Sequence, residues 1–411
     1  MRILFRMKQY EFTHLTPLWV STFIDIIGFS ILIPYLPQFT TSFGATLTQV
    51  GLLLATNSLF SFFGNIFWGS MSDRVGRKPV LLICQFGTLV GFLVLAFSTN
   101  LRMLFLSRII DGVFGGNIPI AKAMIGDVVP PDKRGKEMSN LGVAWTIGSL
   151  LGPGIGGLLS GFGIMGPGLL CVGLSLFTML VTVFFLRESN RSLKKQQPLH
   201  KQAKQPNAKP LSLSLLKQLA PRLLLLQWFF NTLSFFIFIS TVSLYVSVRF
   251  HLNTQQIGWI LTGAGVLKLF VRFFIFLPIL NKFGDEKTVR IGFIIYIIAY
   301  TGLIMVGTIW EYLVINALVS FATACTLDVL SGLMSKAVSN KKQGEMMGLS
   351  AAVDNISQII GPVLGSALLA LPISFAYGLS TAAISLLPLL ISFIPLKARP
   401  GLQKDFSPDQ P

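Results

Sequence analysis

Eight charged side chains stand inside long apolar runs of this chain, where a charge is costly unless it is paired or reached by water. Four are acids and four are bases, so their formal charges balance. A carboxylate in such surroundings can carry a proton, because burial favours its neutral form and a nearby guanidinium favours its charged form. A conformational change that alters either influence would couple proton movement to work. The eight residues are Asp25, Arg108, Asp111, Lys122, Lys268, Arg272, Asp328 and Asp354.

The spacing of these residues predicts which of them share a helix face. At about 100° per residue, Arg108, Asp111 and Lys122 form one polar stripe. Asp111 is then placed to neutralise Arg108 locally, which weakens the case for a direct pair between Arg108 and Asp25. Each acid has the alternative role of a permanent structural ion pair.

In the second half of the chain, Lys268 and Arg272 are four residues apart and therefore lie on one helix face. Two cations in the middle of an apolar helix favour either an anionic group on a bound molecule or ion pairs with Asp328 and Asp354. The sequence leaves both interpretations open.

Composition places these residues in a membrane protein. Of the 411 residues, 52% are hydrophobic and 12% are charged, about half the charge of soluble proteins, and the mean hydropathy is +0.70. The net charge of +17 is explained better by membrane topology than by nucleic-acid binding. No phosphate-binding loop, nucleophile constellation or metal cluster indicates an enzyme. Three cysteines inside apolar runs indicate neither metal ligands nor disulfides: Cys84, Cys171 and Cys325.

The elements that must position the charges are membrane-spanning helices. The first apolar run is long enough to span and lacks a clear cleavage site, so we expect no cleavable signal peptide. Runs of roughly 20 apolar residues predict twelve spans. The spans are 18–38, 47–69, 79–98, 101–124, 139–161, 165–186, 222–248, 256–280, 288–308, 311–336, 345–370 and 372–395.

The distribution of Lys and Arg predicts the topology. Most of the 33 Lys and Arg residues lie at the termini and in alternate loops, so both termini are expected in the cytoplasm. A basic segment with four prolines divides the chain near its middle; it cannot bury enough apolar surface to fold alone, and anionic lipid headgroups are one partner that it could bind. The expected organisation is a six-helix half at 1–186, a cytoplasmic linker at 187–221, a second six-helix half at 222–396 and a tail at 397–411.

The turn between the second and third spans holds the most polar motif of the chain, GSMSDRVGRKPVLL at 69–82. A glycine there permits a positive φ, and an acid can accept backbone N–H groups or face a helix N-terminus. An ordinary hairpin whose cations follow the positive-inside rule is the alternative. Its polar and glycine positions are Gly69, Asp73, Arg74, Gly76, Arg77 and Lys78.

The two halves repeat each other. The segment from Arg134 matches the segment from Gln343 at a constant separation of 209 residues, which pairs Gly152-Pro153 with Gly361-Pro362. The turn at 69–82 has a weaker copy at 281–287, where Asn281 and Gly284 stand in the places of Asp73 and Gly76. Repeated halves are typical of secondary transporters, which bind substrate between the halves near the membrane midplane.

Several motifs together resemble the major facilitator superfamily. The motif at 69–82 resembles the signature of its loop between helices 2 and 3, with Met71 in a place usually taken by leucine. Three other motifs are similar to the drug/proton antiporter branch: an intramembrane acid followed by glycine and prolines in the first span, an Arg-x-x-x-Gly pattern in the fourth, and a glycine-rich signature in the fifth. The matching residues are Asp25, Gly28, Pro34, Pro37, Arg108, Gly112, Gly152, Pro153, Gly156 and Gly157.

The resemblance implies an all-α fold of twelve transmembrane helices in two pseudo-symmetric six-helix bundles. Asp25 matches the family's acid best and is the first candidate for proton coupling, with Arg108 as its modulator or as a substrate-orienting group. In the fifth span, Gly148, Gly152 and Gly156 recur every four residues, which lets a neighbouring helix approach closely. The resemblance implies that this contact seals one side of the cavity; plain small-residue packing is the alternative.

The resemblance also implies residues for the gate and the cavity. Asp73 should meet the N-terminus of the eleventh helix, and Arg77 should reach an acid at the end of the fourth, where Asp127 fits. The aromatic run QWFFNTLSFFIFIS in the seventh span contains Gln227 and Asn231 and suits an aromatic or amphipathic ligand.

The implied function is proton-coupled export of small amphipathic molecules, drugs or metabolites, across a bacterial inner membrane by alternating access. We expect no cofactor, energy from a proton gradient, contact with lipid, and a monomer. Uptake of an anionic nutrient, chelate or metabolite is the alternative, favoured by Lys268 and Arg272. A non-transporting sensor or assembly subunit is a remote one.

Overall fold

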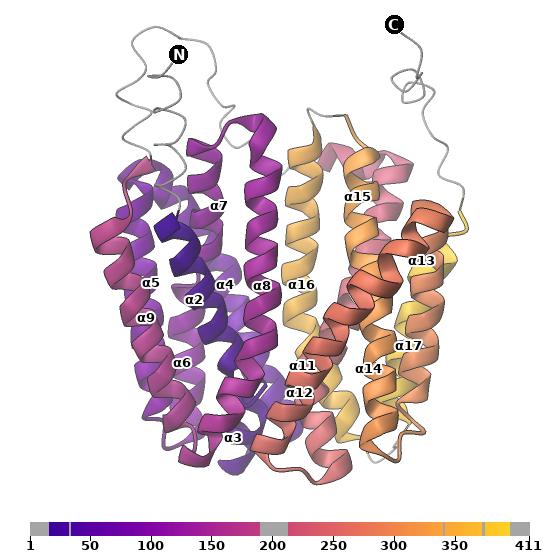
Figure 1. Ribbon diagram of the computed structural model, residues 1–411, viewed down its shortest axis with the longest axis horizontal. Helices are drawn as coiled ribbons and strands as arrows, with labels where there is room; N and C mark the ends of the chain where they lie inside the picture. Colours follow the sequence, from indigo (N-terminus) through magenta and orange to yellow (C-terminus); the bar gives the residue numbers. More distant parts are fainter. Residues whose placement is uncertain (1–15, 33, 190–212, 340–341, 372–374, 395–411) are drawn as a thin grey trace, which may run out of the picture.

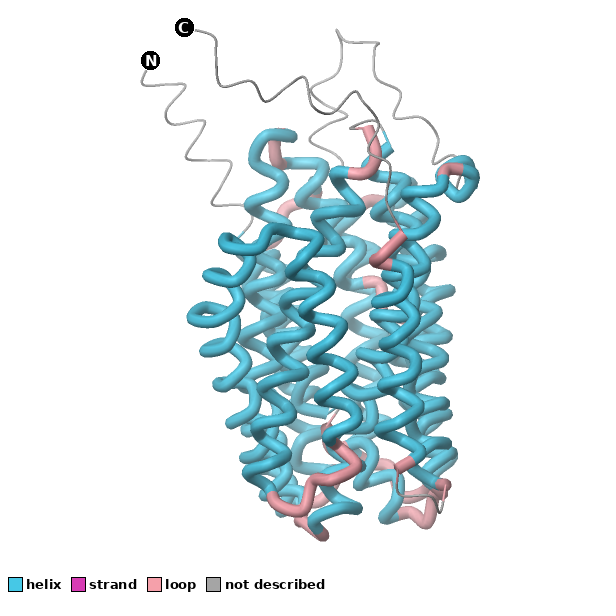
Figure 2. The backbone as a smooth tube through the Cα atoms, turned by 90° about the vertical axis from the view of Figure 1, so that its right-hand side faces the viewer, coloured by secondary structure: helices cyan, strands magenta, loops and turns pink. Residues whose placement is uncertain are grey.

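The structure is a computed structural model that describes residues 16–32, 34–189, 213–339, 342–371 and 375–394. Most of the expected linker and the tail at 397–411 lie outside the described residues. Within them the fold is helical, and no strand is present. Figure 2 shows that the helices run between two ends of the molecule, where the loops gather.

Six spans form the first half of the chain. Two of them, the first and the fourth, are each built from two helices joined end to end. The elements are α2 (Thr16–Leu32), α3 (Leu36–Ser42), α4 (Leu47–Val75), α5 (Arg77–Ala96), α6 (Leu101–Val113), α7 (Asn117–Val128), α8 (Pro131–Leu159), the short 3₁₀ turn η1 (Ser160–Phe162) and α9 (Met165–Phe185).

The second half repeats this arrangement, beside the first in Figure 1. Its eighth and tenth spans each contain a π-helical turn. The elements are η2 (Leu213–Lys217), α11 (Leu219–Phe250), α12 (Thr254–Val271), η3 (Arg272–Phe276), α13 (Leu277–Gly302), α14 (Ile309–Thr323), η4 (Ala324–Asp328), α15 (Val329–Lys336), α16 (Gln343–Ala370) and α17 (Ala376–Ile391).

The predicted twelve-helix fold is confirmed. Seven single helical runs and the 49-residue run Thr254–Gly302 are long and apolar enough to cross a membrane, and the bent pair α2 and α3 adds a ninth candidate. The long run holds two of the predicted spans, because Gly284 breaks it with a φ of 73°. The fifth and twelfth predicted spans correspond to α8 and α17, whose apolar stretches are shorter.

Helix starts at one end of the molecule are fixed by side-chain caps that repeat between the halves. Thr46 and Gln49 form a capping box on α4, and Asn253 and Gln256 form the equivalent box on α12. Asn100 and Thr308 cap α6 and α14 in the same way. Such caps satisfy backbone N–H groups that the helix itself leaves free. We call this end the capped end.

The other end, here called the turn end, carries the glycine turns. Gly76 ends α4 with a φ of 122°, and Gly284 occupies the equivalent place with a φ of 73°. Only glycine adopts such angles without steric cost. The weaker copy of the 69–82 motif therefore keeps the backbone of the turn.

Glycine ridges pack α8 against α2 within the first half, as the four-residue spacing predicts. A Cβ at Gly152 would lie 2.5 Å from the Ser30 Cβ. The second half repeats the contact between α16 and α11, where a Cβ at Gly361 would lie 2.7 Å from the Phe236 Cβ. Glycines leave the helix surface bare at these points, so the helices approach closely. Close van der Waals packing stabilises helix contacts in a membrane, where the hydrophobic effect does not drive them together.

The two halves meet at the capped end. The Gln38 side chain donates to the Ser243 carbonyl at 3.3 Å, and a Cβ at Gly157 of α8 would lie 3.1 Å from the Gly258 Cα of α12. The first turns of α4 pack against the last turns of α16, where a Cβ at Gly51 would lie 2.5 Å from the Pro362 carbonyl oxygen. The structure is thus the state in which the halves are packed at the capped end.

We expect Gly152→Leu to lower the melting temperature of the purified protein by several degrees, because overpacking a close helix contact costs about 1–3 kcal/mol or more. Gly173→Leu on α9 is the matched control, since no atom lies within 4 Å of a Cβ there. Thermal unfolding in detergent measures both variants. Equal melting temperatures for the two would contradict the packing role of Gly152.

Candidate functional site

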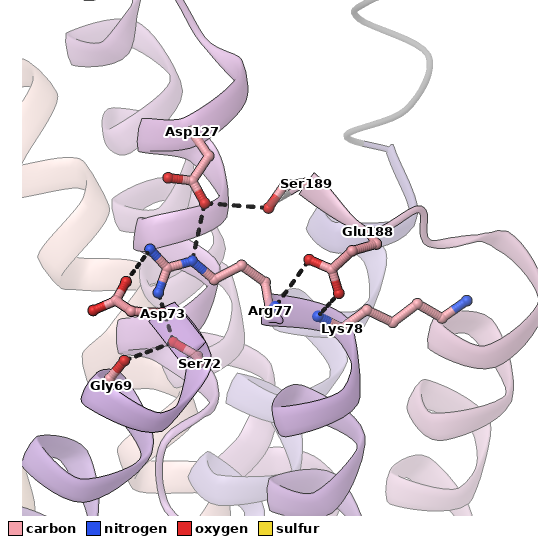
Figure 3. A network of polar contacts seen from close by, with 8 residues as sticks. All are labelled: Gly69, Ser72, Asp73, Arg77, Lys78, Asp127, Glu188 and Ser189. Carbon is pink, nitrogen blue, oxygen red and sulfur yellow. Dashed lines mark hydrogen bonds and ion pairs between the residues drawn. The ribbon is translucent and has the colours of Figure 1, made fainter. Parts of the chain in front are cut away.

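The turn at 69–82 holds a network centred on Arg77 (Figure 3). The Arg77 guanidinium pairs with the Asp73 carboxylate at 2.7 Å and with the Asp127 carboxylate at 2.9 Å. It also donates to the Ser72 hydroxyl at 2.6 Å. The structure contains the predicted contact of Arg77 with Asp127, which joins the second, third and fourth spans.

Sequence reasoning missed a second acid in this network. The Glu188 carboxylate accepts hydrogen bonds from the backbone N–H groups of Arg77 and Lys78, each at 2.9 Å. These are free N–H groups of the first turn of α5, where a negative charge is favourable. Ser189 adds a hydrogen bond to Asp127 at 3.2 Å. Glu188 is the one acid in the basic segment at 187–221. Its isolation among basic residues was the sequence signal that could have identified it as a functional residue.

Asp73 faces outward in this structure. Its side chain is 63% exposed while it pairs with Arg77, and Arg74 beside it is also exposed. Because the halves are packed at the capped end, the expected contact of Asp73 with the N-terminus of α16 concerns the opposite conformation and stays a prediction. In the weaker copy of the motif Asn281 is exposed, and the charged contacts there are Lys336 with Asp285 at 2.6 Å and Arg290 with Glu286 at 4.0 Å.

The intramembrane charges of the first half form a buried cluster. Arg108 pairs with Asp111 at 3.3 Å, and Asp111 also accepts a hydrogen bond from the Asn57 side chain at 2.9 Å. Asp25 instead accepts from the Asn117 side chain at 3.2 Å, while the Thr178 hydroxyl donates to the Ser175 carbonyl at 2.9 Å. Asp111 thus holds Arg108, as its spacing predicts, and the hydrogen-bond donor to Asp25 is neutral.

The predicted stripe of three charges on the fourth span is wrong in one respect. Arg108 and Asp111 are buried on α6, whereas Lys122 on α7 is exposed and interacts electrostatically with Asp354 of the other half. The helix is interrupted at 114–116, so a constant turn of 100° per residue does not carry across it.

The charges of the second half surround a cavity of about 530 Å³. Arg272 and Asp328 pair across it at 2.8 Å, with side chains 44% and 41% exposed. Asp354 accepts from the Trp228 indole at 2.8 Å. The lining residues come from α11, η3, η4, α15 and α16: Trp228, Thr232, Phe235, Phe236, Arg272, Leu327, Asp328, Ser331, Asp354 and Gln358.

The two predicted cations of the eighth span, Lys268 and Arg272, differ in their partners. Arg272 takes the ion-pair role, with Asp328 as its partner. Lys268 is exposed and makes no ion pair with any residue that the structure describes, although it interacts electrostatically with Arg272 and Asp328.

Gln227 and Asn231, which we expected to line the cavity, do not line this one. Gln227 is buried and donates to the Pro388 carbonyl at 3.2 Å, and Asn231 is fully buried. The cavity face of α11 carries Trp228, Thr232 and Phe235, with helical spacing of four and three residues. Gln227 and Asn231 each precede a residue of this face by one position, which turns their side chains by about 100° away from the cavity.

Irregular helix turns mark the same region. The π-helical turn η3 begins at Arg272 and η4 ends at Asp328, so the ion pair joins two π turns. In the first half, the break at 114–116 follows Asp111 and precedes Asn117, the partner of Asp25. π turns and discontinuous transmembrane helices are frequent at binding sites. Both halves thus place intramembrane charges beside interrupted helices.

The glycine-rich motif of the fifth span packs against neighbouring helices. Gly148 and Gly156 pack on Ile26 and Ile31 of α2, and Pro153 lies inside the continuous helix α8. The Tyr35 hydroxyl donates to the Pro153 carbonyl, at the point where Gly157 meets α12.

Comparison with known proteins identifies the family of this chain. The family model of the Major Facilitator Superfamily matches residues 18–253 and 224–410. The chain is 30% identical over 349 residues to the tetracycline resistance protein, class B, of Escherichia coli, covering 84% of this chain and 86% of that protein. It is 28% identical over 384 residues to the multidrug resistance protein MdtG of Salmonella typhi, covering 89% of each.

Solved structures share the fold at low sequence identity. The human organic anion transporter MFSD10 aligns with a TM-score of 0.68 and 20% identity, over 93% of this chain and 99% of that chain. A bacterial homologue of the human lysosomal transporter Spinster, in an inward-facing and unoccupied conformation, aligns with a TM-score of 0.72 and 16% identity, over 93% and 96%. The chain therefore belongs to the major facilitator superfamily, with relatives in its drug/proton antiporter branch, and is a membrane transporter rather than an enzyme.

Proposed function

We propose that the protein exports small amphipathic molecules, drugs or metabolites, across a bacterial cytoplasmic membrane in exchange for protons. It works as a monomer by alternating access, needs no cofactor and has both termini in the cytoplasm. The relatives named as tetracycline and multidrug resistance proteins support this function. The turn end is then the cytoplasmic end, and the structure is the inward-facing state.

The observation that carries the proposal is the set of partners around Asp25. A neutral amide, Asn117, donates to its carboxylate at 3.2 Å. The nearest guanidinium in the cluster, Arg108, is paired with Asp111. Asp25 can therefore gain or lose a proton without breaking an ion pair, whereas protonation of Asp111 or Asp328 would break one.

The position of Asp25 links the proton to movement of the halves. It lies on α2, whose next two turns carry Ser30 and Ile31 against the glycine ridge of α8. The same helix α8 meets α12 of the other half through Gly157. A change in the hydrogen bonds of Asp25 thus acts on α2, and α2 packs on α8, which contacts the other half. The interface between the halves is the two-state element that coupling requires.

The network at the turn end supplies the cytoplasmic gate. Arg77, Asp127 and Glu188 hold the turn against the fourth and sixth spans, which leaves the Asp73 carboxylate exposed toward the opening. When the halves close at this end, Asp73 meets the N-terminus of α16, where a negative charge is favourable. The gate therefore stabilises the outward-facing state.

We expect Asp25→Asn to abolish efflux driven by a proton gradient while the protein stays folded, because the asparagine cannot carry a proton. The measurement uses inside-out vesicles, in which export appears as uptake. The rate of ethidium uptake driven by an imposed pH gradient is compared between Asp25→Asn and the native protein. Asp285→Asn is the matched control, since that carboxylate pairs with Lys336 at the turn end. Undiminished proton-driven efflux in Asp25→Asn would overturn the role of Asp25.

Asp73→Asn should slow transport about tenfold, which corresponds to the loss of one favourable contact between a charge and a helix terminus. Asn281→Ala, at the equivalent position of the other half, should change it less than about twofold, as exposed substitutions usually do. Initial efflux rates in the same vesicles compare the two. Equal effects would count against a gate that only the first half provides.

A further inference from the structure

The cavity of the second half has an excess of negative charge on its walls. Its lining contains one cation, Arg272, and two acids, Asp328 and Asp354. Arg272 and Asp328 pair at 2.8 Å and neutralise each other. Asp354 makes no ion pair with any residue that the structure describes, and the neutral Trp228 indole donates to it at 2.8 Å. One negative charge of the wall is therefore left without a counter-ion.

The lysines of this region stand outside the cavity lining. Lys122 of α7 and Lys268 of α12 are both exposed, and neither lines the cavity. Lys122 is near enough to Asp354 for an electrostatic interaction, but among the described residues neither lysine makes an ion pair. Because water and salt screen an exposed charge, neither lysine takes the place of a counter-ion inside the cavity.

Asp354 shares a face of α16 with a second polar group of the lining. Gln358 follows Asp354 by four residues, so the two side chains lie on one helix face, and both line the cavity. The carboxylate supplies the negative charge, and the neighbouring amide can both donate and accept hydrogen bonds. This face of α16 therefore suits the polar, positively charged end of a bound molecule.

Three aromatic rings of α11 form another wall of the cavity. Trp228, Phe235 and Phe236 line it, and the two phenylalanine rings pack edge to face with their centroids 5.4 Å apart. The face of an aromatic ring attracts a cation. Trp228 lies beside Asp354, whereas the phenylalanines lie two turns further along α11, about 10 Å at 1.5 Å per residue. They are thus closer to the capped end, where Ser243 of α11 contacts the other half.

This arrangement separates the unpaired charge from the apolar part of the cavity. A positive group on a bound molecule would give Asp354 a counter-ion, which a charge at membrane depth requires unless water reaches it. An apolar or aromatic body attached to that group would extend toward Phe235, Phe236 and Leu327. The volume of about 530 Å³ is typical of sites for small molecules.

We infer that the substrate is an amphipathic organic cation, with one ammonium or other singly charged positive group bound at Asp354 and Trp228 and an apolar or aromatic body against Phe235 and Phe236. The inference rests on the proposed transport function and specifies its substrate class. The charge of the substrate is then met in the second half, whereas Asp25, the proposed proton carrier, belongs to the first half and does not line this cavity.

Three fluorophores with the same dansyl body and different charges test the inference: dansylcholine is a cation, dansylamide is neutral and dansylglycine is an anion. Each is titrated at equilibrium, at neutral pH and without a proton gradient, against the purified full-length protein in discs of zwitterionic phosphatidylcholine. We expect dansylcholine to bind at least about tenfold more tightly than dansylamide, because it adds an attraction between opposite charges at the cavity wall. Dansylglycine should bind more weakly than dansylamide.

Substitutions at Asp354 identify the site. Asp354→Asn should lower the affinity for dansylcholine about tenfold, to that for dansylamide, and leave the affinity for dansylamide unchanged. Asp354→Glu keeps the charge and should bind dansylcholine within about threefold of the native protein. Asp285→Asn is the matched control, since that carboxylate pairs with Lys336 at the turn end. Thermal unfolding shows whether a variant is folded, and the comparison of the three probes on the native protein depends on no variant.

Equal affinity for all three probes, preference for dansylglycine, or no saturable binding of dansylcholine would each overturn the substrate class. Unchanged dansylcholine affinity in Asp354→Asn would overturn the site. These outcomes are separable from failure of the transport proposal. Proton-driven ethidium uptake that is undiminished in Asp354→Asn would overturn the role of Asp354 alone. Binding of dansylcholine that depends on Asp354, without proton-driven movement of ethidium, would overturn proton-coupled export alone.

Discussion

The cost of placing charge inside a membrane organises this protein. A charged side chain at membrane depth must find a partner, water or a ligand, and the structure meets that requirement in different ways for different residues. Arg108 and Arg272 have carboxylate partners. Asp25 and Asp354 have neutral hydrogen-bond donors, Asn117 and Trp228. Asp25 and Asp354 make no ion pair with a residue that the structure describes, so either can take up a proton without breaking one.

The halves share their backbone and differ in their side-chain chemistry. Capping boxes at Thr46 and Asn253 and positive-φ glycines at Gly76 and Gly284 occupy equivalent places, as do the glycine ridges on α8 and α16. The network around Arg77, however, belongs to the first half alone among the described residues. The repeat thus keeps what the fold requires, while the Arg77 network and the cavity beside Arg272 and Asp328 use residues specific to one half.

The Arg77 network and the interface between the halves lie at opposite ends of the same helices. In α4 the first turns pack against α16 at the capped end, and the last turn carries Asp73 at the turn end. A rigid helix therefore cannot pack against the other half at both ends at once, which is the geometry that the proposed alternating access requires. Small residues make the closed contact dense, and the hydrogen bond from Gln38 to the Ser243 carbonyl adds a polar contact between the halves.

The sequence by itself determined the class of fold, the positions of the spans and the repeat, because apolar run length and residue type decide these locally. The ion pair of Arg77 with Asp127 was expected from the family resemblance and not from spacing. The tertiary structure alone decided which charges meet. Glu188 reaches the start of α5 across 111 residues, and the break at 114–116 separates Lys122 from Arg108. One residue of helix rotation turns Gln227 into the core and Trp228 into the cavity. Such pairings depend on helix phase and on contacts between distant segments, which residue spacing within one helix cannot encode.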